Sequence, residues 1–425
     1  MGFEASYTTL DEDVLQHRAA FSEALWQSQC ETYNASGLRQ LLVITRAGKR
    51  SPRSSWHTKY VVPLLEQIQQ AGPNVSEELL TWAQAFDQNG SEARRESLEG
   101  RDEIEAQGAG MAAHFFQARG LEDTTWSALD EWSMQAAWAD KAGREAFQSF
   151  KRGFFDGLSL QRAQVINEQR PTLPRGMAAP FPLQEVWPEI CTSDAGWLRR
   201  RPWCPRFWQL RGDEEAERRK VLAKLAPQVA AAVRARLGFS VEGDAALGFI
   251  FACKTIYAQN ASHAEEALPC RLVAELLHAL PPLEAAATWR SQHGAAEWAV
   301  EPALRRLAEL LRSWDSGPRE MSVWCTDGVL LSALLTASGL LADAVPQRKL
   351  AAMAPAASRL AVAITNSGVA CVEYNFRPLA VWASATQWAQ ELEATLTAID
   401  ESSLCSLRAN ASSASDAVSF ASLVT

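Results

Sequence analysis

The sequence lacks the short motifs that mark several common classes of protein. It has no P-loop, no dinucleotide-binding glycine fingerprint and no H-E-x-x-H metal motif. None of its eight cysteines forms a C-x-x-C pair, which argues against a zinc ribbon or a redox motif. We therefore expect no metal site and no cofactor.

Long hydrophobic runs are also missing. No run reaches the roughly 18 apolar residues that a membrane span needs. The nearest candidate, Gly328 to Val345, is interrupted by polar residues and predicts a buried helix. The acidic start has no apolar core of a signal peptide, so we expect a cytoplasmic protein, or a secretory one if the N-terminus is incomplete. Gly2 begins an M-G-x-x-x-S pattern, which predicts a membrane contact through N-myristoylation.

The composition is that of an ordinary globular protein. The chain has 425 residues, of which 47% are apolar and 21% charged. This length suits one large α/β domain with an inserted domain, or two to three small domains. The net charge of −9 argues against nucleic acid as a partner, although an acidic protein can still hold a small anion in a basic pocket.

Hydrophobic periodicity predicts the arrangement of the chain. Short apolar runs at Leu41–Thr45 and Met321–Cys325 are typical of strands buried on both faces. Between them, Glu214–Leu237 carries an apolar stripe of helical period. The predicted fold class is α/β with an inserted α-helical domain.

Two loops follow these strands, where open parallel sheets bind their ligands. The first contains Arg46, Ala47, Gly48, Lys49 and Arg50, followed two residues later by Pro52. Arginine presents a fork of donors that matches phosphate oxygens, and glycine lets the backbone approach a ligand. From spacing alone, an anion site and a solvated basic turn are equally supported.

The first loop resembles the R-H-G-x-R-x-P signature of the histidine acid phosphatases, with Ala47 at the histidine position. In that family the histidine attacks phosphorus and the arginines hold the phosphate. The resemblance covers about residues 35–395 and is greatest to the multiple inositol polyphosphate phosphatase branch, which includes phytase-like enzymes. It implies that Arg46 and Arg50 bind phosphate, with Lys49 beside them.

The second loop resembles the family's histidine–aspartate pair. Thr326 stands at the second histidine position, and Asp327 matches the proton donor or, in a plainer interpretation, caps the following helix. A further family arginine falls on Ala142, with Arg144 nearby as a displaced phosphate ligand. Alanine cannot act as a nucleophile, so the catalytic histidines are replaced.

The resemblance also implies a fold and domain boundaries. We expect a three-layer sandwich with a mainly parallel sheet, like that of phosphoglycerate mutase, and an inserted α-helical cap. The predicted parts are an N-terminal extension at 1–34, a core at 35–158 and 318–398, a cap at 159–317, and a disordered Ser/Ala-rich tail at 399–425. Cys253 and Cys270 form a disulfide if the chain is exported, and are buried thiols otherwise.

Three functions remain open. The first is a pseudophosphatase that binds an inositol phosphate or another phosphomonoester without turnover. The second is a residual acid phosphatase that uses Asp327 with another nucleophile, such as His57, or with an activated water. The third is a non-catalytic structural or interaction protein. Whether the chain is an enzyme is therefore uncertain from the sequence.

Overall fold

The computed structural model describes residues 21–30, 37–48, 56–89, 98–116, 132–138, 141–169, 191–194, 205–259, 266–277, 295–316, 319–326, 328–340 and 357–398. Within these residues, seven strands form one sheet in the order β3-β2-β4-β1-β5-β6-β7. The strands are β1 (Leu38–Arg46), β2 (Trp132–Trp138), β3 (Cys191–Asp194), β4 (Arg319–Thr326), β5 (Arg359–Thr365), β6 (Ala370–Tyr374) and β7 (Arg377–Trp382).

The sheet is mixed, so the expectation of a mainly parallel sheet is not confirmed. The β1–β4, β2–β3 and β2–β4 pairs are parallel, whereas β1–β5, β5–β6 and β6–β7 are antiparallel. The reason lies in the connections. The last three strands are joined in sequence, and β6 and β7 are separated only by Asn375 and Phe376, a link that requires antiparallel neighbours. The α/β class itself is confirmed.

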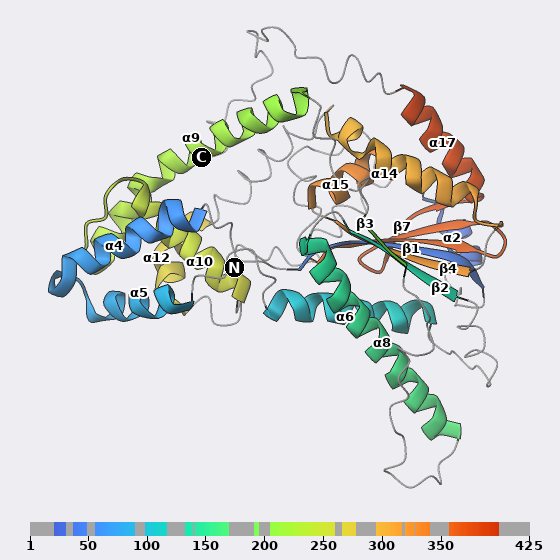
Figure 1. Cartoon of the computed structure of the whole chain (residues 1–425), viewed down its shortest axis with the longest axis horizontal. Helices are drawn as coiled ribbons and strands as arrows, with labels where there is room; N and C mark the ends of the chain where they lie inside the picture. The colour runs from blue at the N-terminus through green and yellow to red at the C-terminus, as the bar shows by residue number, and fades with distance from the viewer. Residues whose placement is uncertain are drawn as a thin grey trace.

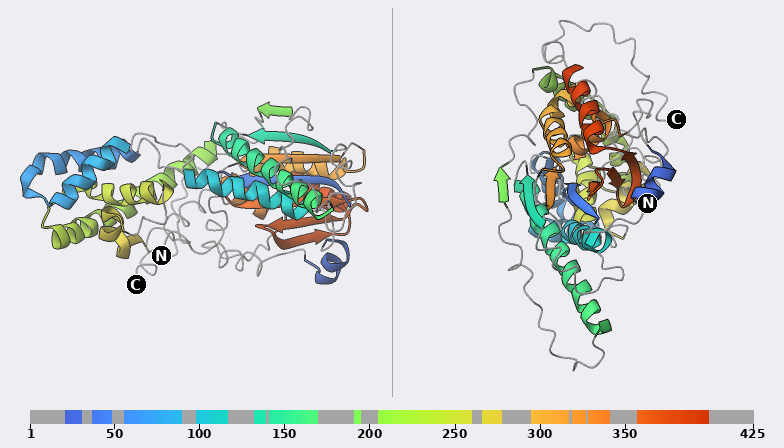
Figure 2. Two further views of the ribbon diagram at one scale, coloured as in Figure 1. Left: turned by 90° about the horizontal axis from the view of Figure 1, so that it is seen from below. Right: turned by 90° about the vertical axis from the view of Figure 1, so that its right-hand side faces the viewer.

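Helices cover both faces of the sheet (Figures 1 and 2). On one face, α6 (Leu98–Phe116) and α8 (Lys141–Gln169) pack over a core that includes Val43, Val323 and Phe150. On the other face lie α14 (Ala295–Arg312), α15 (Gly328–Ala337) and α17 (Ala385–Ala398), with a core that includes Ile44 and Trp324. Because alternate residues of β1 and β4 serve the two cores, their middle positions are apolar except for Ser322 of β4.

A third core belongs to a group of helices beside the sheet, at the left of Figure 1. Its members are η1 (His57–Val61), α4 (Val62–Ala71), η2 (Gly72–Asn74), α5 (Glu77–Asn89), α9 (Pro205–Leu237), η5 (Gly243–Leu247), α10 (Gly248–Gln259) and α12 (Leu268–Leu277). Helices α4 and α5 belong to this group although they precede the predicted cap. Helix α14 falls within the predicted cap but packs on the sheet. The predicted domain boundaries stay a prediction, since packing does not fix where a domain ends.

Two disulfides tie distant segments of the described chain together. Cys253 and Cys270 join α10 to α12, which selects the disulfide alternative for this pair. Cys30 follows α2 (Glu23–Gln29), a helix within the predicted N-terminal extension, and bonds to Cys371 of β6. Among the described residues, no helix is long and apolar enough to cross a membrane. Gly2 and the predicted tail lie outside the described residues.

Candidate functional site

The two loops singled out in the sequence meet at one edge of the sheet. In the parallel β1–β4 pair, Arg46 is the register partner of Thr326. The next residue, Ala47, donates its backbone N–H to the Thr326 carbonyl oxygen at 3.4 Å. Parallel strands end at the same edge, so segments far apart in sequence come together there. Ala47 and Thr326, the two positions at which the sequence resemblance leads one to expect histidine, are therefore neighbours.

The backbone of the first loop is held from its other side by the segment that leads into β5. The Arg46 N–H donates to the Ser358 carbonyl oxygen at 2.8 Å, and the Ala357 N–H donates to the Ala47 carbonyl oxygen at 3.2 Å. The preceding Thr45 is fully buried, and its hydroxyl donates to the Gln107 side chain of α6 at 3.1 Å. Arg46 and Ala47 thus project from a fixed backbone rather than from a loose turn.

The Arg46 guanidinium lies against the first residue of α15. A Cβ atom placed on Gly328 would be 2.9 Å from both Cζ and Nε of Arg46. Glycine is the residue that lets the guanidinium come this close to the helix start. Helix N-termini present unsatisfied backbone N–H groups and favour anions. Arg46 and the start of α15 therefore favour negative charge at the same place.

Two more helices begin at this edge. Gly48 packs so tightly on α6 that an added Cβ would overlap the Gly100 carbonyl oxygen, at 2.0 Å. At the start of α8, a Cβ on Gly143 would lie 2.9 Å from the carbonyl oxygen of Cys325, the residue before Thr326. The N-terminal ends of α6, α8 and α15 thus lie around the ends of β1 and β4. The dipole of each helix is positive at this end.

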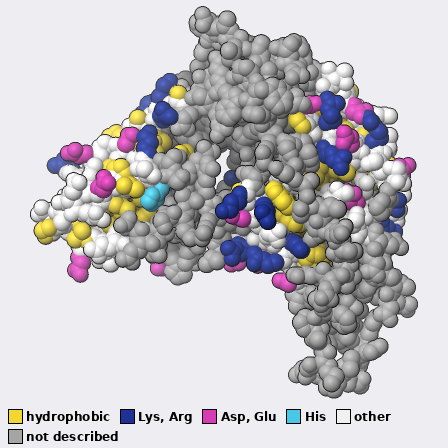
Figure 3. Space-filling view, viewed as in Figure 1, with side chains coloured by type: hydrophobic (Ala, Val, Ile, Leu, Met, Phe, Trp, Pro, Cys, Tyr) yellow, Lys and Arg dark blue, Asp and Glu magenta, His cyan; other side chains and the backbone are white. Residues whose placement is uncertain are grey.

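Cations add to this positive field. The first turn of α8 contains no acidic residue but holds Lys141 and Arg144, both exposed, and Arg101 lies in the first turn of α6. Figure 3 shows Lys and Arg side chains gathered near the middle of this face, where Figure 1 places the first turns of α6 and α8. A cation near a helix N-terminus opposes the dipole and costs about 0.3–1 kcal/mol. A bound anion would offset this cost.

The structure brings some of the predicted site residues together and leaves others undescribed. Arg46, Ala47, Thr326 and the first turn of α8 with Arg144 lie around the strand ends. Lys49, Arg50 and Asp327 lie outside the described residues. His57 starts η1, and its ring stacks at 6.3 Å on Phe86 within the third core. In this position the imidazole packs against α5, away from the ends of β1 and β4.

Sequence reasoning missed the contribution of β5 to this edge. Arg359 is the register partner of Thr45 and is almost completely buried, at 1% exposure. Its guanidinium carbon lies 3.1 Å from the centroid of the Phe376 ring. The signal in the sequence is a charged residue at the head of the apolar run LAVAIT. Among the described residues, no group of three or more His, Cys, Asp or Glu side chains could hold a metal ion.

The fold has known counterparts among solved structures. The phytase from D. castellii superimposes with a TM-score of 0.58 at 11% identity, over 93% of this chain and 87% of that one. A Bifidobacterium longum multiple inositol polyphosphate phosphatase in complex with inositol hexasulfate gives a TM-score of 0.55 at 9% identity, over 87% and 93%. The same protein in complex with phosphate gives 0.51 at 10% identity, over 91% and 97%.

These likenesses define the class of fold. The chain has the fold of the phytases and multiple inositol polyphosphate phosphatases, the histidine acid phosphatase structures that its first loop resembles. No family model and no curated protein matches the sequence. The fold is therefore shared at an identity too low for the neighbours' activity to be carried over directly.

Proposed function

We propose that this protein is a pseudophosphatase: it binds a phosphorylated ligand of the inositol phosphate type at the ends of β1 and β4 and does not hydrolyse it. The observation that carries the proposal is the contact of Arg46 with Gly328. It combines a guanidinium with a helix N-terminus on a backbone fixed by both neighbouring strands. The fold supports an inositol phosphate ligand, because a neighbour with the same fold is in complex with inositol hexasulfate.

The lack of turnover follows from the residues at the two histidine positions. Ala47 has no lone pair to attack phosphorus. Thr326 has a hydroxyl, but the residue is only 5% exposed. No basic side chain lies next to it in β4 to take the hydroxyl proton. Removing a covalent nucleophile lowers turnover by on the order of a millionfold in a well-studied protease. We propose that Arg46, Lys49, Arg50 and Arg144 contact the phosphate groups, and that Asp327 is no longer used as a proton donor.

The proposal is tested by ligand-induced stabilisation. Inositol hexakisphosphate at about 100 times its dissociation constant should stabilise the folded protein by about 2.7 kcal/mol, which raises the melting temperature. Arg46→Ala should lose this rise. Arg234→Ala is the matched control, because Arg234 is an exposed arginine in the last turn of α9, and it should keep the full rise.

The opposite pattern would contradict the proposal. If Arg46→Ala and Arg234→Ala show the same rise as the native protein, inositol hexakisphosphate binds elsewhere. If the native protein shows no rise with this ligand or with a small aryl phosphate, the site does not bind phosphate and the structural alternative gains support.

A further inference from the structure

A polar cavity lies on the same face of the sheet as α14, away from Arg46. It has a volume of about 330 Å³ and is walled by β2, β4 and α14. Ser322 of its floor precedes Thr326 by four residues of β4, which is roughly 13 Å at the rise of a strand. The buried row formed by Ala137, Trp324 and Ile44 crosses the sheet between the two places. The cavity is therefore separate from the strand-end site.

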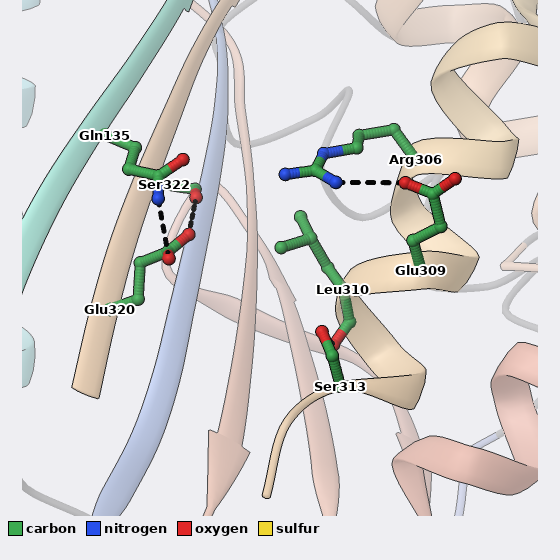
Figure 4. Close-up of polar contacts among 7 residues, drawn as sticks. All are labelled: Gln135, Arg306, Glu309, Leu310, Ser313, Glu320 and Ser322. Carbon is green, nitrogen blue, oxygen red and sulfur yellow. Dashed lines mark hydrogen bonds and ion pairs between the residues drawn. The ribbon is translucent and has the colours of Figure 1, made fainter. Parts of the chain in front are cut away.

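The floor is unusual for a sheet covered on both faces. Strands in this setting are apolar at nearly every position. Here Gln135 and Ser322 are register partners that point toward α14. Glu320 precedes Ser322 by two residues and therefore lies on the same face of the sheet. Figure 4 shows the three side chains converging: Gln135 Nε2 donates to one Glu320 oxygen at 2.9 Å, and the Ser322 hydroxyl donates to the other at 2.7 Å.

Glu320 decides which hydrogen bonds the floor can offer to a ligand. An ionised carboxylate only accepts hydrogen bonds, so Gln135 and Ser322 each donate one to Glu320. Gln135 is left with its carbonyl oxygen and one amide N–H, and Ser322 with its oxygen lone pairs. The floor therefore presents two acceptors and one N–H donor, a combination that suits hydroxyl groups, since these both donate and accept.

The wall across from the floor sets the charge. Arg306 and Glu309 of α14 form an exposed ion pair at 2.9 Å (Figure 4). Glu320 does not line the cavity, but it is hydrogen-bonded to Gln135 and Ser322 of the floor, so two carboxylates lie close to the cavity against one guanidinium. This balance disfavours anions and tolerates neutral or cationic ligands. Ala137, Leu310 and Trp324 add apolar surface against which C–H groups can pack.

We infer that this cavity binds a small polyhydroxylated molecule, uncharged or aminated, of the size of a monosaccharide or a free cyclitol. The volume is at the lower end of small-molecule pockets, which span about 300–1,000 Å³. The site is independent of the phosphate site proposed above, because it shares no residue with it and selects against negative charge.

Ligand-detected NMR on the full chain tests this inference, with glucose, myo-inositol and glucosamine as probes. All three should bind, and glucosamine should bind most tightly because of its ammonium group. Glucose 6-phosphate, measured on the Arg46→Ala variant to silence the strand-end site, should bind more weakly than glucose. Gln135→Leu removes one floor acceptor and should weaken glucose by about five- to tenfold.

Glu309→Gln is a second cavity variant in case Gln135→Leu does not fold, because Glu309 is exposed at the rim and its substitution should not disturb folding. It should weaken glucosamine and spare glucose. Glu393→Gln on α17 is the matched control, since Glu393 pairs with Arg312 of α14 but does not line the cavity, and it should change neither. Absence of binding by all three probes, or binding that ignores both cavity variants, would overturn the inference. So would glucose 6-phosphate binding as tightly as glucose.

Discussion

The backbone N–H of Ala47 donates to the carbonyl oxygen of Thr326, so the two positions at which the sequence resemblance leads one to expect histidine are hydrogen-bonded neighbours. The ends of β1 and β4 thus hold these two positions together on one backbone. Arg46 precedes Ala47 and is the register partner of Thr326. Its guanidinium lies at the start of α15, a position that favours a bound anion. The following predictions test the proposal that this site binds phosphate without turnover.

Gly328→Ala should weaken inositol hexakisphosphate binding by displacing Arg46. The new methyl group would sit 2.9 Å from the guanidinium carbon, so the side chain must move. We expect a loss of about 1–3 kcal/mol in binding free energy, comparable to a hydrogen bond to a charged group. Titration calorimetry measures it.

A double-mutant cycle shows whether the effect runs through Arg46. In an Arg46→Ala background, Gly328→Ala should cost almost nothing further. Equal losses in both backgrounds would show that the methyl group acts directly on the ligand or on the helix, and not through the guanidinium.

Arg144→Ala should have opposite effects on stability and on binding. Arg144 is exposed in the first turn of α8, where a cation opposes the dipole, so its removal should stabilise the free protein by about 0.3–1 kcal/mol. The same change should weaken inositol hexakisphosphate. Chemical denaturation with and without ligand gives both quantities.

Arg234→Ala supplies the control of opposite sign. Arg234 lies in the last turn of α9, where a cation suits the dipole, so this change should slightly destabilise the free protein and leave binding unchanged. If both arginine variants shift stability in the same direction, the dipole argument for α8 fails.

Reduction of the disulfides should lower stability substantially. Cys253–Cys270 closes a segment with a sequence separation of 17, for which about 3 kcal/mol is expected from the lost freedom of the unfolded chain. Cys253→Ser with Cys270→Ser should show this loss in the denaturation midpoint. If a reducing agent lowers the midpoint of this double variant as much as that of the native protein, this bond contributes nothing, and Cys30–Cys371 accounts for the effect.

Phe376 should stabilise the fold through the buried Arg359. Its ring lies over the guanidinium, although its φ of 66° is a conformation that non-glycine residues rarely adopt. Phe376→Leu should cost about 2 kcal/mol through the lost cation–π contact, whereas Phe376→Tyr should be close to neutral. Equal midpoints for the two variants in urea would show that apolar bulk alone matters.

The strands that position the site could be predicted from the sequence, because apolar runs such as Leu41–Thr45 leave few alternatives. The meeting of Arg46 and Thr326 followed from parallel strands ending at one edge. In contrast, β3 lies in a Pro- and Trp-rich stretch with no strand pattern. The predicted cap at 159–317 includes α14, yet α14 packs on the sheet, which its own sequence does not reveal.

Contacts that depend on tertiary packing were out of reach. Nothing local marks Gly328 as the residue beneath Arg46, and the pairing of Cys30 with Cys371 cannot be deduced from spacing. The polar positions Gln135, Glu320 and Ser322 were not singled out from the sequence, where Met321–Cys325 was taken as one apolar run. Their meaning emerged only when the register placed them side by side.

The most direct test of the central claim is phosphate release from inositol hexakisphosphate by the native protein, across roughly pH 4 to 8, beside an Ala47→His, Thr326→His double variant. The account predicts no release by the native protein at concentrations where the ligand raises its melting temperature. Release by the double variant would further show that the site still has the shape for phosphate. Release by the native protein that Arg46→Ala abolishes would contradict the account and show that another nucleophile is at work.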